Sequence, residues 1–219
     1  MNATRRLLNL VLVLSLAALT ACRPIPAPPG NEGPTRYALP GVLHYLAGDF
    51  DAAIEDFDEA IRLDPINVDA LTGRAHVYFG RGVANGNFDT SRREDADLED
   101  LNAAMRDYDE VIRIKPSKAD AYYNRGLAYL RRAPYSKGQA FVTEYGSTVA
   151  VVNTIDLHKA VNDFTEAIRL HAMHISPDDP RPYLARAIAQ RALRQYEEAF
   201  QDYGEAIRLD PAYAEAYLQ

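Results

Sequence analysis

Apolar residues recur in four segments at offsets 0, 1, 4, 7, 8 and 10, a spacing that places them on one face of a helix. Within each segment, small alanines alternate with bulky Phe, Tyr or Met side chains. The four segments begin at Ala53, Ala104, Ala160 and Ala199. The pattern predicts four amphipathic helices of similar construction.

Each of these helices belongs to a longer repeated unit. Residues 180–213 form one complete 34-residue unit, and most of its pattern appears three more times upstream. A single unit of this size cannot bury its own apolar face, so neighbouring units must stack. We therefore expect an all-α solenoid of helical hairpins with about four repeats, the first degenerate. A fifth repeat starts at Ala214 and leaves an open C-terminal end.

The repeat frame is interrupted twice, each time between the two helices of a unit. Counting against the frame gives insertions of about 17 and 22 residues, at about residues 83–98 and 134–155. The second helices of repeats two and three should then begin near Leu98 and Asp156. Both insertions should leave the same edge of the solenoid, where such insertions often form a binding surface.

The two insertions differ in composition. Asn85, Asn87 and Asp89 alternate like the start of a calcium loop, but the required Gly and terminal Glu are missing, so a flexible loop is favoured. The second insertion is β-branched and apolar around Tyr145-Gly146, which predicts a hairpin. Its apolar side chains either pack back on the helices or meet a partner.

Each second helix also carries Asp, Glu and Arg at fixed places. Glu and Arg lie three residues apart, which supports a helix. The Asp residues should line up along the array, and we expect a solvated face there rather than a cation-binding ladder. They are Asp56, Asp107, Asp163 and Asp202.

The N-terminus resembles a bacterial lipoprotein signal peptide. Arg5 and Arg6 precede an apolar run from Leu7 to Ala21, which ends in Leu-Thr-Ala-Cys22. The resemblance implies removal of residues 1–21 and lipidation of Cys22. Residues 22–40 form a Pro-rich linker, and residues 41–219 the solenoid.

The repeats resemble the tetratricopeptide repeat (TPR) family. The resemblance rests on Leu71, Tyr122 and Tyr183 at the fourth position of a repeat and on Ala75, Gly126 and Ala187 at the eighth. In the first repeat Pro40-Gly41 falls inside the first helix, which we expect to begin only there.

The resemblance implies protein or peptide binding on a concave surface lined by first helices. The main candidates are His76, Phe79, Tyr123, Asn124, Arg131, Arg181 and Arg191. Repeat position also maps to this surface Asp69, Thr72, Gly73, Leu127, Leu184 and Ile188. Asn124 matches the backbone-binding Asn of the family. Thr72 and Gly73 occupy places where a clamp for C-terminal carboxylates needs Lys or Asn, so a chaperone-tail adaptor is not expected.

The sequence offers no enzyme motif and implies no cofactor. It has no Gly-rich phosphate loop, nucleophile elbow or His-Glu-x-x-His motif. His171, Met173 and His174 could hold a metal ion, but we expect a polar surface loop there. A net charge of −7 without a basic run disfavours nucleic acid as a partner.

The sequence therefore predicts a lipoprotein of the bacterial cell envelope, extracytoplasmic and anchored to a membrane. Its solenoid would act as a scaffold that binds envelope proteins. Two alternatives stay open. One is a structural subunit that self-associates through the C-terminal end, and the other is a surface lipoprotein that binds a small ligand.

Overall fold

The computed structural model describes residues 35–84, 95–133, 141–142, 148–149, 153–174 and 179–212. These residues belong to one compact unit. The predicted signal peptide, Cys22 and residues 85–94 lie outside the described residues. The described elements are α2 (Thr35–Ala47), α3 (Phe50–Leu63), α4 (Val68–Ala84), α5 (Asp95–Ile114), α6 (Ala119–Arg132), β1 (Phe141–Val142), β2 (Thr148–Val149), α7 (Thr154–His174), α8 (Arg181–Ala192) and α9 (Tyr196–Leu209).

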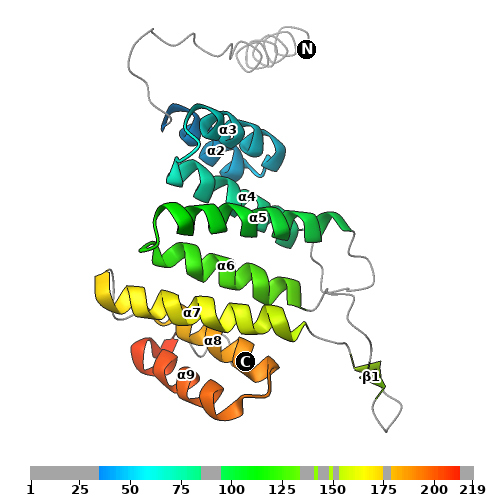
Figure 1. The fold of residues 1–219 in the computed structure, drawn as a ribbon, viewed down its shortest axis with the longest axis vertical. Helices are drawn as coiled ribbons and strands as arrows, with labels where there is room; N and C mark the ends of the chain where they lie inside the picture. The colour runs from blue at the N-terminus through cyan, green and yellow to red at the C-terminus, as the bar shows by residue number, and fades with distance from the viewer. Residues whose placement is uncertain are drawn as a thin grey trace, which may run out of the picture. The chain divides into compact units, whose positions relative to one another are not determined.

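The helices stack in chain order, each packing on the next (Figure 1). Helices α2, α4, α6 and α8 are the first helices of four successive repeats, and α3, α5, α7 and α9 are the second helices. Helix α2 also contacts α4, and α6 contacts α8. The predicted solenoid of helical hairpins is confirmed. No described helix has the length and apolar character of a membrane span.

An aromatic ring fills the core of each of the first three repeats. Phe57, Tyr108 and Phe164 occupy equivalent positions and are buried. A Cβ atom added at Gly73 would lie 2.4 Å from the ring of Phe57, and one at Gly126 would lie 2.7 Å from the ring of Phe164. Glycine stands at these helical positions because the rings occupy the space of a side chain.

The expectation of a solvated row of Asp residues is wrong. Asp107, Asp163 and Asp202 are only 5–7% exposed. Each accepts two hydrogen bonds from an Arg on the first helix of its own repeat, which makes a bidentate ion pair. The pairs are Arg74–Asp107 at 2.7 and 2.8 Å, Arg125–Asp163 at 2.6 and 2.9 Å, and Arg186–Asp202 at 2.7 Å for both bonds.

The same Arg residues also reach the preceding repeat. The third nitrogen of Arg74 donates to Asp58 on α3 at 2.5 Å. Arg125 donates to Asp109 on α5 at 2.6 Å. Arg186 likewise donates to Thr165 on α7 at 3.0 Å. Each guanidinium group therefore connects its own helix to the second helices of two successive repeats.

In the first repeat a different pair of residues connects the two helices. Pro40 stands at the place that Arg occupies in the later repeats, so it offers no cation. One turn later, His44 Nδ1 lies 2.7 Å from Asp56 Oδ2. The expected helix start at Pro40-Gly41 is wrong, because α2 begins at Thr35 and includes residues of the predicted linker. Ala38 packs against the core around Phe57, and this burial favours the earlier start.

The insertions have the predicted lengths. Arg186 and Asp202 are 16 residues apart, whereas Arg74–Asp107 and Arg125–Asp163 are separated by 33 and 38 residues. The excesses over 16 are the expected 17 and 22 residues. The predicted hairpin is also confirmed: β1 and β2 pair antiparallel, with Phe141 opposite Val149.

The helices next to the insertions are longer than expected. Helix α5 begins at Asp95 rather than near Leu98, and α7 begins at Thr154. A second bidentate pair lies near the start of each of these helices: Arg81 with Asp100, and Arg132 with Asp156. Because Asp156 is 1% exposed, the root of the second insertion is fixed by a fully buried carboxylate.

Stability should depend strongly on the buried pairs and little on the surface ones. Asp107→Ala leaves Arg74 half-buried without its bidentate partner, so we expect a loss of about 3 kcal/mol or more in the free energy of unfolding. Glu110→Ala, one turn later on α5, removes the exposed pair with Arg113 at 2.5 Å and should change stability little. Urea denaturation measures the free energy of unfolding of both variants. Equal losses would contradict the larger contribution assigned to the buried pair.

Candidate functional site

A small pocket lies between α6 and α8. Its volume is about 90 Å³, and apolar side chains from both helices form most of its lining. The candidates Tyr123 and Arg181 meet at this pocket, with the guanidinium carbon of Arg181 5.5 Å from the centroid of the Tyr123 ring. Of the residues mapped by repeat position, Leu127, Leu184 and Ile188 also line it. The structure thus brings five mapped residues together.

Arg181 is held in place by Asp179. Its Nη2 donates to Asp179 Oδ2 at 2.8 Å, and its backbone N–H donates to Asp179 Oδ1 at 3.0 Å. Burial on its own would raise the pKa of Asp179, but the hydrogen bonds and charge of Arg181 hold that pKa below its usual value. Arg181 therefore presents an oriented but partly neutralised cation at the pocket.

His76 and Asn124 form a second contact between first helices. The amide nitrogen of Asn124 on α6 lies 3.1 Å from Nε2 of His76 on α4. An amide nitrogen can only donate, so Nε2 accepts and the imidazole is neutral in this contact. Burial, and then the charge of Lys118, lowers the pKa of His76 below 6.5. The contact joins the first helices of repeats two and three.

Family models match the chain across these helices. The model described as TPR repeat matches residues 41–82 and 93–132, and the model described as tetratricopeptide repeat matches residues 180–213. Together the matched ranges cover just over half of the chain. The chain belongs to the TPR family.

Two characterised proteins are similar to this chain over most of its length. The Hsp70-Hsp90 organizing protein of Triticum aestivum is 24% identical over an alignment of 216 positions that covers 82% of this TPR chain and 36% of that protein. The U-box domain-containing protein 70 of Oryza sativa subsp. japonica is 28% identical over an alignment of 200 positions that covers 77% of this chain and 24% of that protein. The TPR chain therefore spans about a third or less of these relatives.

Solved TPR structures share the fold at low identity. A tetratricopeptide repeat protein from Parabacteroides merdae ATCC 43184 superposes with a TM-score of 0.57 at 19% identity, covering 88% of this chain and 57% of that one. MamA from Desulfovibrio magneticus RS-1 gives a TM-score of 0.56 at 16% identity, with coverages of 82% and 76%. At these identities the likeness establishes the TPR fold alone.

The structure places other mapped residues outside the pocket. Gly73 faces the ring of Phe57, so its mapping to the TPR binding surface is wrong. Phe79 packs against the buried clusters around Tyr108 and Met105. Arg131 is half-buried on α6, and Arg191 is exposed in the last turn of α8. Whether Phe79, Arg131 and Arg191 bind a partner stays a prediction.

The expected surface loop at His171 is wrong. Helix α7 continues to His174, and Leu170 and His171 are buried, which favours another helical turn. His171 Nε2 lies 3.8 Å from Asp179 Oδ2. In the part of the chain that the structure describes, no group of three or more His, Cys, Asp or Glu is placed to hold a metal ion.

The stability of the TPR array should respond to the protonation of His76. The unfolded chain binds a proton near pH 6.5 and the folded chain only at lower pH, so protons favour unfolding in this window. The stability that neutral His76 supplies is complete above pH 6.5 and is lost as the pH falls toward the folded pKa. We expect His76→Gln to flatten this part of the stability profile in urea denaturation. His158→Gln, at an exposed site, should leave it unchanged, and a wild-type slope in His76→Gln would contradict the assignment.

Proposed function

We propose that this TPR chain is a lipid-anchored scaffold of the bacterial cell envelope that binds an extended segment of a partner protein at the α6–α8 pocket. The observation that carries the proposal is the meeting of Tyr123, Arg181 and an apolar floor at that pocket. An apolar side chain of the partner would enter the pocket. Arg181 would then donate a hydrogen bond to a carbonyl or carboxylate of the partner beside it.

The surrounding structure supports such a role. The Arg–Asp pairs fix the spacing of the helices that carry the pocket. Less free energy is therefore lost in ordering these helices when a partner binds. Tyr and Arg are also the residue types that contribute most to protein interfaces. Among the relatives, the Hsp70-Hsp90 organizing protein bears a name that denotes action on other proteins.

The membrane anchor is proposed from the sequence of residues 1–22. A basic start, an apolar run and the Leu-Thr-Ala-Cys22 ending support lipidation of Cys22. More than one acyl chain makes membrane binding stable, whereas a single chain gives marginal binding. Lipidation in this way would place the repeats outside the cytoplasm.

Self-association is a second candidate, favoured by the surface of α9. Phe200 and Ile207 are 79% and 40% exposed. Their equivalents on α5 are Met105 and Ile112, which pack against clusters that include residues of α6. The face of α9 that would meet a following helix is thus apolar and exposed within the described residues, and a second copy could cover it.

The binding proposal predicts which variant loses its partner. Crosslinked pull-down from envelope extract, with mass-spectrometric identification, should recover a partner with the wild-type chain but not with Tyr123→Ala/Arg181→Ala. A control that removes the same residue types from α9, Tyr196→Ala/Arg208→Ala, should retain the partner. Loss with the α9 control alone would place the binding surface on α9 instead, and equal recovery by all three baits would contradict a role of the pocket.

The anchor proposal predicts a covalent modification. Cells fed a radiolabelled fatty acid should label the wild-type protein, and Cys22→Ala should abolish the label because the chain has no other thiol. The variant should also stay unprocessed at the signal peptide. Persistent labelling of Cys22→Ala would contradict the anchor.

A further inference from the structure

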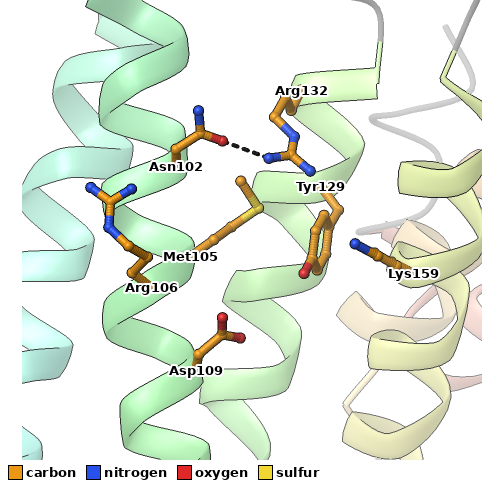
Figure 2. A pocket seen from close by; sticks show the side chains of 7 residues that line it. All are labelled: Asn102, Met105, Arg106, Asp109, Tyr129, Arg132 and Lys159. Atoms are coloured by element: carbon orange, nitrogen blue, oxygen red, sulfur yellow. Dashed lines mark hydrogen bonds between the residues drawn. The ribbon is translucent and has the colours of Figure 1, made fainter. Parts of the chain in front are cut away.

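A larger pocket lies among α5, α6 and α7, and it shares no lining residue with the α6–α8 pocket. Its volume is about 260 Å³. Figure 2 shows Met105 of α5 and Tyr129 of α6 in its middle, with the charged side chains of Arg106, Arg132 and Lys159 around them. The pocket therefore combines an apolar floor with a cationic border.

The cations at this pocket are not equivalent. Arg132 is balanced by Asp156, to which it donates at 2.6 and 2.8 Å, and it also donates to Asn102 at 2.5 Å. Lys159 lies over the ring of Tyr129, with Nζ 5.2 Å from the centroid. Within the described residues, neither Lys159 nor Arg106 has a carboxylate within 4.0 Å. These two exposed cations supply the pocket's available positive charge.

Asp109, the acid in the lining, is already engaged. Its Oδ1 accepts a hydrogen bond from Arg125 at 2.6 Å. Asp109 therefore offers little competition to an external anion for Lys159 and Arg106. Figure 2 shows its carboxylate at the opposite end of the pocket from Arg132.

The equivalent place one repeat earlier has the opposite charge. Three cations and one acid line the pocket among α5, α6 and α7, whereas one cation and three acids occupy the equivalent positions on α3, α4 and α5. The changes that invert the charge are Asp51 to Asn102, Glu55 to Arg106 and Ala103 to Lys159. The fold accommodates both the cationic and the acidic set of side chains at this position. Stability alone therefore does not require the cations at the pocket among α5, α6 and α7.

We propose that this pocket binds an acidic segment of a partner protein. Lys159 and Arg106, which lie on opposite sides of Met105 and Tyr129 (Figure 2), each receive a carboxylate of the segment, and the aliphatic stems of those side chains pack on Met105 and the Tyr129 ring. An anionic membrane fits less well, because a flat lipid surface cannot enter a pocket. The site goes beyond the proposed function, since it is separate from the α6–α8 pocket and does not depend on it.

The test uses a fluorescein-labelled oligoglutamate peptide and fluorescence anisotropy, with oligoglutamine as the uncharged comparison. The wild-type protein should bind oligoglutamate in a salt-dependent manner and leave oligoglutamine unbound. Arg106→Ala/Lys159→Ala should weaken binding about tenfold, because two charge-assisted contacts are lost. All four substituted positions of this variant and its control are exposed, so the fold should persist, and circular dichroism checks this.

The control Lys115→Ala/Arg208→Ala removes the same net charge outside the pocket and should weaken binding less than twofold. Tyr123→Ala/Arg181→Ala should also bind oligoglutamate normally, which separates this site from the proposed scaffold surface. Equal weakening by the pocket variant and the control, or no binding of oligoglutamate to wild type, would overturn the proposal. So would pocket-dependent binding only to vesicles of equal parts phosphatidylglycerol and phosphatidylcholine, which would indicate a lipid site instead.

Discussion

A guanidinium group in each of repeats two to four makes hydrogen bonds to two neighbouring helices at once. In repeat three, Arg125 on α6 pairs with the buried Asp163 on α7 and also with Asp109 on α5. Burying charges is costly unless every polar atom finds a partner, so the bidentate geometry fixes one spacing and register for the three helices. Each repeat is thereby tied both internally and to the one before it.

The insertions and the pockets depend on this arrangement. Long segments can enter between paired helices because Arg81–Asp100 and Arg132–Asp156 close the helix pair at the root of each insertion. The two pockets lie between helices whose spacing the same pairs fix. Binding specificity can then arise from a few substitutions while the helix spacing stays the same. Lys159 in repeat three, which stands at the position equivalent to Ala103 in repeat two, is an example.

Periodicity was enough to predict the repeats, the helix pairs, the insertion lengths and the Glu–Arg contacts on the second helices. It failed for the Asp row, because an Asp in a polar stripe looks the same whether it faces water or an Arg on another helix. The partner of Asp107 is 33 residues away in the sequence, and the regular placement of Arg74, Arg125 and Arg186 was the signal that could have revealed it. Gly73 was assigned to the surface for a similar reason, since a glycine carries no sign of the ring that packs against it. The cationic pocket was missed because its side chains come from three helices.

Hydrogen–deuterium exchange with mass spectrometry on Arg125→Ala tests the central claim most directly. The account predicts faster amide exchange in α5 and α7 as well as in α6, because this one side chain bonds to both neighbours. Arg113→Ala, which removes an exposed contact on α5, serves as the comparison and should leave exchange close to wild type. An increase confined to α6, with α5 and α7 unchanged, would contradict the claim that Arg125 connects successive repeats.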